Sequence, residues 1–165
     1  MEVQIVKKIF LTMVTLLVLM FALSGCGVFS QPELGSAYKA EGISTIQTAF
    51  APLAVKAYEI VIDLQFGSIW DANKVKSGTV KFNNVVLSGD RVETNPPEYN
   101  VVDGSYNTTD RTLVLKCQEK TNSSLIVVKG RVSTDHELVE DGFVYKTHNS
   151  TDLSNRIGYF DANKQ

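Results

Sequence analysis

The stretch ISTIQTAFAPLAVKAYEIVIDLQFG, residues 43–67, decides the fold expected for this chain. Ser44 and Gln47 have the spacing of a helix capping box, and Gly67 suits a helix stop. Between them the apolar residues recur at steps of three and four, which places them on one helix face: Ile43, Ile46, Phe50, Leu53, Ala57, Ile60 and Leu64. The sequence therefore predicts an amphipathic helix here.

Two features of the same stretch oppose a single straight helix. Pro52 would kink a helix interior at a cost of about 3 kcal/mol, unless the helix begins there with Pro52 in its first turn. Every second residue from Tyr58 to Phe66 is also aliphatic or aromatic, which is the alternation of a strand. Whether residues 57–66 form helix or strand stays open, and the helix is preferred for its matching start and stop signals.

Downstream, short apolar and β-branched runs alternate with turn-forming residues, the pattern of an antiparallel sheet. The predicted strands cover residues 79–87, 91–94, 99–106, 112–117, 125–131 and 156–160. Residues 125–128 are apolar at both odd and even positions, and these positions point to opposite faces of a strand. We therefore expect this strand to be covered on both faces. Asp141-Gly142 suits a two-residue hairpin turn that would pair Val139 with Val144 and, further out, Asp135 with His148.

These elements together predict an α+β domain, with one N-terminal amphipathic helix packed on a curled antiparallel sheet of about six to eight strands. The alternative is a small, mainly-β barrel. We expect residues 1–25 to be a leader, residues 26–42 a flexible tether because they contain Pro, Gly and Ser, and residues 43–165 one globular domain. A lead-in strand through Leu34 and Tyr38 is the alternative to the tether.

The charge balance limits the kinds of partner. The leader contains Glu2, Lys7 and Lys8, so the remaining 140 residues contain 14 Lys and Arg against 17 Asp and Glu, with no basic run. This balance argues against nucleic acid as a partner and against an electrostatic hold on a membrane.

No pattern of catalytic residues stands out in the sequence. His136 and His148 would point to opposite faces of the expected hairpin, so a shared metal site is not expected. The acidic residues at 135–141 lack the spacing of a calcium loop, and neither a Gly-x-Ser-x-Gly elbow nor a phosphate-binding loop occurs. We therefore expect no catalytic, cofactor-binding or metal-binding residues, and a protein that is not an enzyme.

Cys117 and the aromatic residues carry two further expectations. Cys117 lies two and four residues after Leu115 and Leu113, so its side chain points to the same face of the strand as theirs. We therefore expect a buried, unreactive thiol rather than one that pairs between molecules. Most aromatic residues should belong to the core of so small a domain. Joint exposure of Trp70, Phe143 and Tyr145 would instead favour a surface for a partner or a glycan.

The first 26 residues have the order of an export signal. Lys7 and Lys8 precede an apolar run over residues 9–23, which is shorter than the about 20 residues needed to span a bilayer. The run ends in Leu23-Ser24-Gly25-Cys26, which resembles the lipobox of bacterial lipoproteins.

The resemblance implies a covalent lipid anchor. A lipoprotein signal peptidase would recognise Leu23, Ser24 and Gly25 and cut before Cys26, whose sulfur would carry a diacylglyceryl group and whose new amine an acyl chain such as palmitate. Two or more chains hold a protein stably on a membrane. Because residue 27 is glycine rather than aspartate, the resemblance favours the outer membrane in a cell with two membranes, and otherwise the outer face of the cytoplasmic membrane.

The sequence thus predicts a bacterial lipoprotein of the cell envelope that acts as a partner-binding or envelope-assembly module. The expected partner is an envelope protein or polymer, and not nucleic acid. One alternative is a small-ligand carrier with an apolar cavity between helix and sheet, and a third, less favoured, is an envelope hydrolase with scattered catalytic residues. The specific partner, the membrane and the oligomeric state stay open.

Overall fold

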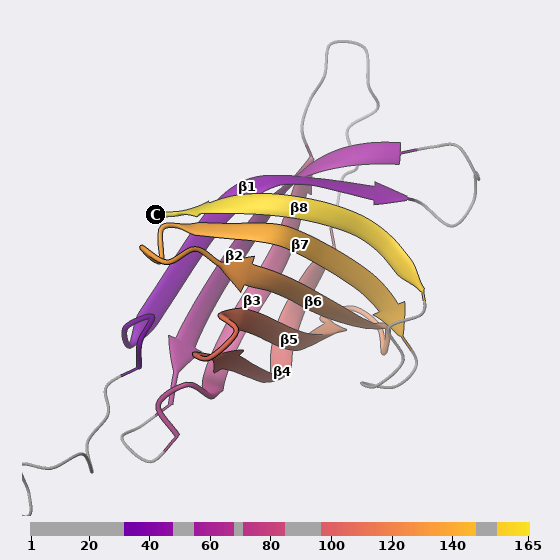
Figure 1. Ribbon diagram of the computed structural model, residues 1–165. Helices are drawn as coiled ribbons and strands as arrows, with labels where there is room; N and C mark the ends of the chain where they lie inside the picture. Colours follow the sequence, from indigo (N-terminus) through magenta and orange to yellow (C-terminus); the bar gives the residue numbers. More distant parts are fainter. Residues whose placement is uncertain (1–31, 48–54, 68–70, 85–96, 148–154) are drawn as a thin grey trace, which may run out of the picture. The chain divides into compact units, whose positions relative to one another are not determined.

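The computed structural model describes residues 32–47, 55–67, 71–84, 97–147 and 155–165. These residues form eight antiparallel strands that close into a barrel in sequence order, with β1 pairing β8 (Figure 1). The strands are β1 (Ala37–Gln47), β2 (Val55–Phe66), β3 (Val75–Asn84), β4 (Glu98–Asn107), β5 (Thr112–Glu119), β6 (Leu125–Val132), β7 (Leu138–Thr147) and β8 (Arg156–Lys164).

Strand β2 shows how the sequence specifies the barrel. Every second residue from Tyr58 to Phe66 is buried inside, and the intervening side chains lie on the outer face, half-buried or exposed. This two-residue period is the alternation that the sequence shows for a strand. It gives the barrel wall two distinct faces, because the apolar side chains of β2 fill the inside while the polar ones face outward.

The predicted helix, and with it the α+β fold class, is wrong. Residues 43–47 lie in β1 and residues 55–66 in β2, and the described residues contain no helix. The three-four spacing arises across two separate strands: Ile60 is fully buried in β2, whereas Ile43 is 57% exposed on β1. Ser44 is buried within β1 and caps nothing. The sheet closes on itself, which is the architecture of the mainly-β alternative.

The first strand begins before residue 43, at Ala37. Leu34 is only 4% exposed, and Gly35, with a φ of 85°, donates its N–H to the carbonyl of Pro32 at 2.9 Å. The N–H of Phe66 then donates to the carbonyl of Ser36 at 3.0 Å. Residues 37–42 therefore lie in the barrel wall, as the lead-in strand alternative has it, and residues 26–31 lie outside the described residues.

The hairpin predicted at Asp141-Gly142 is wrong as well. Asp141 does have the positive φ of a turn, 52°, but it lies inside β7, where the register with both neighbouring strands shifts. The residue is part of a bulge, which accommodates the same backbone angle without reversing the chain. Val139 consequently pairs with Val132 on β6 instead of with Val144.

The reversal between β6 and β7 occurs at residues 133–137. His136 has a φ of 63° there, and its N–H donates to the carbonyl of Ser133 at 3.1 Å. The Asp135 carboxylate accepts hydrogen bonds from the Ser133 hydroxyl and from the N–H of Glu137. His148, the expected partner of Asp135, lies outside the described residues.

Other strand predictions are confirmed. The predicted strands at 99–106, 112–117, 125–131 and 156–160 correspond to β4, β5, β6 and β8. In β6 three consecutive residues, 126–128, are buried, so both faces are covered at Val127, whereas Lys129 and Arg131 farther along the same strand face outward. Strand β3 begins at Val75 and ends at Asn84, and residues 85–96 lie outside the described part.

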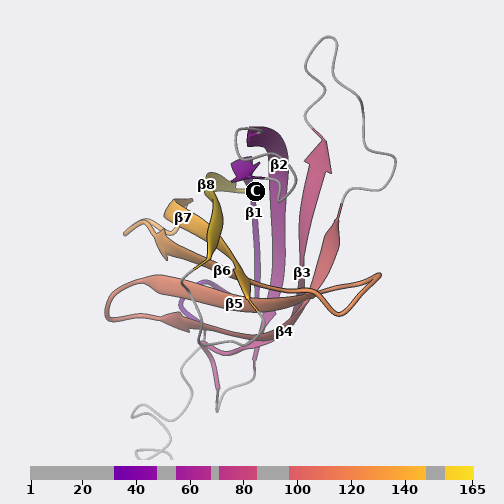
Figure 2. The ribbon, with the colours of Figure 1, turned by 90° about the vertical axis from the view of Figure 1, so that its right-hand side faces the viewer.

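Figures 1 and 2 show β1–β3 crossing the direction of β5–β7, so the inner faces of two halves of the sheet pack on one another. Fully buried side chains from all around the wall meet in this core, among them Ala40, Ile62, Val80, Leu115, Val144 and Ala162. Within the described part of the chain, no helix has the length and hydropathy needed to cross a membrane.

Candidate functional site

The barrel interior is occupied by side chains. Three hydroxyl groups of the described residues, on Tyr38, Ser44 and Tyr106, are buried without a hydrogen-bond partner. Leaving such a group unpaired costs about 1–3 kcal/mol. Within the described part of the chain no helix is present to bound the expected apolar ligand cavity. The outer face carries the surface features described next.

Burial raises the pKa of three interior groups. Tyr38 and Tyr99 shift from 10.0 to about 12, chiefly by desolvation, with Glu137 near Tyr38 and Glu119 near Tyr99 adding to the rise. Cys117 is fully buried and its pKa rises from 9.0 to about 12 by desolvation. The predicted burial of this thiol is confirmed, and a thiol with a raised pKa is a poor nucleophile at neutral pH.

We expect these groups to make the fold sensitive to alkali. Each folded pKa lies above its unfolded value, so the stabilisation is fully present below the unfolded pKa and is lost as the pH rises through the folded one. The window runs from about pH 9 to about pH 12, and Cys117 alone accounts for a loss on the order of 4 kcal/mol across it. Urea denaturation at a series of pH values measures this loss.

The matched control is Cys117→Ala combined with Tyr38→Phe, which removes two of the titrating groups. This variant should lose clearly less stability between pH 9 and pH 12 than the parent chain. An equal loss in both proteins would contradict the assignment of the alkaline transition to these groups.

The outer face of β6–β8 carries a cluster that we call the basic–aromatic patch: Lys129, Phe143, Tyr145, Arg156 and Tyr159. The ladder places its members side by side, because Phe143 pairs with Lys129 on one side and Tyr159 on the other, and Tyr145 pairs with Arg156. The Arg156 guanidinium lies 5.1 Å from the centre of the Phe143 ring, and the Phe143 and Tyr145 ring centres are 6.3 Å apart.

Two cations of this patch lack acidic partners. Among the described residues neither Lys129 nor Arg156 forms an ion pair, whereas Arg131 at the patch edge contacts Glu140 at 3.3 Å and Asp141 at 3.1 Å. Tyr159 is 61% exposed, the largest exposure among the large hydrophobic residues of the described part. The patch therefore offers positive charge and aromatic surface together.

A shallow hollow of about 260 Å³ lies within the same wall. Lys129, Phe143 and Tyr145 of the patch line it. The rest of its lining consists of Thr112, Gly130, Arg131 and Asp141. A hydroxyl, two aromatic rings, the ion pair of Arg131 with Asp141 and the Lys129 ammonium thus converge on one concave surface. Lys129 is the cation there that suits the recognition of a polar, negatively charged ligand.

The opposite wall has a different charge. The outer face of β1–β4 carries Glu41, Glu59, Asp63, Glu98 and Asp103, against Lys39, Lys76 and Lys81. Part of this charge is internally paired, since Glu98 contacts Lys81 at 3.2 Å and Lys120 at 2.6 Å, which lowers the pKa of its carboxyl. Strands β5–β8 contain six Lys and Arg against four Asp and Glu, whereas β1–β4 contain four against five, so positive charge is in modest excess on the side of the patch.

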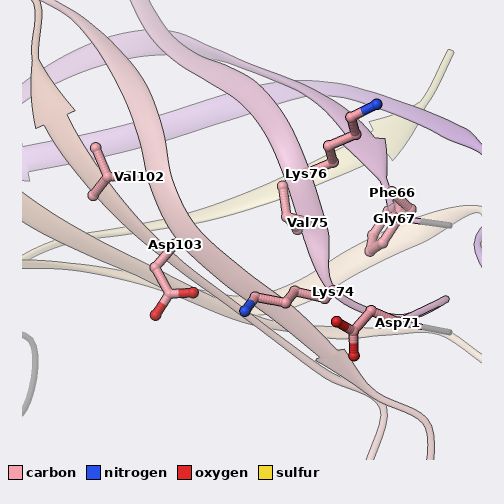
Figure 3. A pocket seen from close by; sticks show the side chains of 8 residues that line it. All are labelled: Phe66, Gly67, Asp71, Lys74, Val75, Lys76, Val102 and Asp103. Carbon is pink, nitrogen blue, oxygen red and sulfur yellow. The ribbon is translucent and has the colours of Figure 1, made fainter.

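A second surface feature, which we call the β3–β4 opening, interrupts the wall. The two strands pair at Thr79–Lys81 and touch again through a single bridge between Lys74 and Ser105. Between these points residues 75–78 and 101–104, all described, have no partners across the ladder. A cleft of about 660 Å³ lies here, lined by Phe66, Gly67, Asp71, Lys74, Val75, Lys76, Val102 and Asp103 (Figure 3).

The residues singled out from the sequence contribute little to these features. His136 lies at the β6–β7 turn, with Nε2 3.4 Å from an oxygen of Glu33 and its ring edge-on to Tyr106. The described residues contain no group of three His, Cys, Asp or Glu side chains placed to hold a metal ion. Leu23, Ser24, Gly25 and Cys26 lie outside the described residues, as does Trp70.

Sequence reasoning identified Phe143 and Tyr145 as possible surface aromatics but did not connect them with Lys129, Arg156 and Tyr159. The only available signal was that all five residues fall at outward-facing positions of three neighbouring strands. The wrong hairpin register at Asp141-Gly142 concealed this relation. Comparison of the chain with models of protein families, with curated proteins and with solved structures finds no match.

Proposed function

We propose that this chain is a lipid-anchored protein of the cell envelope that binds an acidic glycan on the basic–aromatic patch. The observation that carries the proposal is that Lys129 and Arg156 form no ion pair with another described residue and lie beside three aromatic rings. The anchor is the lipid on Cys26 that the lipobox resemblance implies. The barrel then serves as a rigid carrier for the patch.

The chemistry of the patch suits such a polymer. Lys129 on β6 and Arg156 on β8 are separated by β7, and two strand spacings amount to roughly 10 Å. A linear glycan with repeated carboxylate or phosphate groups reaches both cations, and guanidinium groups pair well with either anion. The C–H faces of its sugar rings stack on the exposed ring of Tyr159 and on Phe143. The strands hold these side chains in place before binding, which lowers the entropic cost.

A glycan fits the chain better than nucleic acid or an anionic membrane. The mature chain is acidic, with 17 Asp and Glu against 14 Lys and Arg, and its opposite wall carries five carboxylates. Such a charge distribution repels an extended polyanion that wraps the protein, while one basic face still accepts a polymer lying along it. Exported proteins of the envelope also meet glycans directly.

The first test is charge reversal on the patch, read out as binding of polygalacturonate by calorimetry at low salt. The Lys129→Glu and Arg156→Glu variants should each bind at least about tenfold more weakly, since each change replaces an attraction by a repulsion. Binding by the parent chain should also weaken as the salt concentration rises, because exposed charges are screened.

The matched control is Lys39→Glu, which makes the same charge change on β1, away from the patch. It should leave polygalacturonate binding unchanged, and Tyr159→Ala should weaken it without changing the net charge. Equal losses of polygalacturonate affinity in Lys39→Glu and Lys129→Glu would show that the overall charge of the protein, and not the patch, sets the affinity. Tighter binding to single-stranded DNA or to anionic vesicles than to polygalacturonate would overturn the choice of a glycan.

A further inference from the structure

The outer surface of the basic–aromatic patch continues across the seam where β8 meets β1. Tyr159 of the patch pairs with Thr45 on β1. Two residues further along, Asp161 on β8 pairs with Ile43. Ile43 is therefore the diagonal neighbour of Tyr159, at a separation that aromatic side chains bridge. Ile43 is 57% exposed and Tyr159 61%, and they are two of the three large hydrophobic residues that the described chain exposes.

Carboxylates flank Ile43 on both sides. The ladder places Asp161 of β8 on one side of it and Glu59 of β2 on the other. Neither carboxylate forms an ion pair with another described residue. Oδ1 of Asp161 accepts one hydrogen bond, from the N–H of Asp141 at 3.2 Å, and a carboxylate has capacity for several. The surface at Ile43 is therefore apolar at its centre and negative at its rim, with an acceptor free for a further donor.

The positive charge lies at the other edge of the patch. Lys129 is on β6, and the Arg156 guanidinium lies 5.1 Å from the centre of the Phe143 ring. Phe143 pairs with Tyr159, and the two strands that carry them are roughly 5 Å apart, which is close to the length of one pyranose unit. Two consecutive sugars therefore match the two rings. The first lies within reach of both cations, and the second lies beside Ile43.

These two positions favour different sugars. A carboxylate on the first sugar pairs with the cations, whereas a carboxylate on the second meets Asp161 and is repelled. An acetamido group suits the second position, because it is uncharged and combines a methyl group for Ile43 with an N–H for the Asp161 carboxylate. A hydroxyl in its place supplies no methyl group. The same surface thus attracts one sugar and rejects a charged neighbour, and both effects contribute to specificity.

We propose that the patch selects a glycan in which an acidic sugar adjoins an uncharged, N-acetylated sugar. The inference rests on the proposed glycan function and names the class of polymer. The acidic sugar pairs with Lys129 and Arg156, and the N-acetylated sugar stacks on Tyr159. Its acetamido methyl lies against Ile43 and its N–H donates to Asp161.

The test compares three tetrasaccharides by calorimetry at low salt, with the full chain in detergent micelles. Hyaluronan tetrasaccharide alternates glucuronate with N-acetylglucosamine, tetragalacturonate is acidic throughout, and chitotetraose is N-acetylated throughout and uncharged. Hyaluronan tetrasaccharide should bind at least about threefold more tightly than tetragalacturonate, the gain expected for one buried methyl group. It should bind at least about tenfold more tightly than chitotetraose, which has no carboxylate for the two cations.

Three variants locate the acetamido contact. Ile43→Ser should weaken binding of hyaluronan tetrasaccharide about threefold and leave tetragalacturonate binding unchanged. Val102→Ser is the matched control, since Val102 is 51% exposed on β4, outside the patch, and it should affect neither ligand. Asp161→Asn keeps an acceptor for the N–H of Asp141 and removes the repulsion, so tetragalacturonate should bind more tightly and the difference between the two acidic ligands should narrow.

The outcomes separate this inference from the glycan function itself. If tetragalacturonate binds and Lys129→Glu weakens it, but hyaluronan tetrasaccharide binds no more tightly, selection at Ile43 is overturned and glycan binding stands. Equal losses in Ile43→Ser and Val102→Ser, or an equal loss for both acidic ligands in Ile43→Ser, would overturn the acetamido contact. If neither the acidic tetrasaccharides nor polygalacturonate bind, both proposals fall.

Discussion

Replacement of Gly42 by alanine is expected to disrupt closure of the barrel. Gly42 lies in β1 opposite Ala162 of β8, in the pairing that joins the first strand to the last. A Cβ added at this glycine would lie 1.9 Å from the carbonyl oxygen of Asp161 and 2.6 Å from the Cα of Ala162. Both contacts involve the backbone, so no side-chain rotation relieves them. The loss of unfolding free energy should exceed the about 1–3 kcal/mol of ordinary overpacking.

Urea denaturation followed by circular dichroism measures this effect. The control is the neighbouring Ile43→Ala, which removes an exposed side chain from the same strand and should cost no more than about 0.5 kcal/mol. If Gly42→Ala melts like the parent chain, β1 and β8 do not approach each other as closely as the register requires, and closure of the barrel would be in doubt.

The same region explains why the sequence indicated a helix. Ile43 and Ile46 in β1, and Ala57, Ile60 and Leu64 in β2, fall by chance at helical spacing. A pattern search treats them as one segment, because nothing in the composition marks residues 48–54 as a break except Pro52. The decisive signal was the alternation from Tyr58 to Phe66, which is uninterrupted over five residues on one face. Here tertiary pairing with two neighbouring strands outweighs the local capping signals.

The later strands were easier to predict, because turn residues separate them clearly. Their register was not. Asp141-Gly142 has the residue types of a hairpin turn, but the positive φ of Asp141 belongs to a bulge inside β7. The chain reverses direction at His136 instead. A bulge of one residue moves every later side chain to the other face. For this reason the basic–aromatic patch and the β3–β4 opening, both of which depend on bulges, were out of reach of sequence reasoning.

Replacement of Cys26 by serine is expected to release nearly all of the protein from the membrane fraction. The lipobox resemblance makes Cys26 the only lipid carrier, and each buried methylene contributes roughly 0.8 kcal/mol, so two or more acyl chains supply the whole hold. The patch does not replace them, because its few cations attract an anionic surface by only about 1 kcal/mol each. Fractionation of cells that express the parent and the variant at equal levels measures the change.

Cys117→Ser serves as the control, since that thiol is buried in the barrel and should carry no lipid. This variant should stay with the membrane, and only its location is compared, because a hydroxyl in place of a buried thiol also lowers stability. Mass spectrometry of the N-terminal peptide adds an independent reading: a lipidated Cys26 as the first residue is expected. A Cys26→Ser protein that stays membrane-bound, or a mature chain that still begins at Met1, would refute the anchor. Glycan binding by the basic–aromatic patch would then need a different cellular setting, because the seven residues from Cys26 to Pro32, which span at most about 22 Å, would no longer tie the barrel to the membrane.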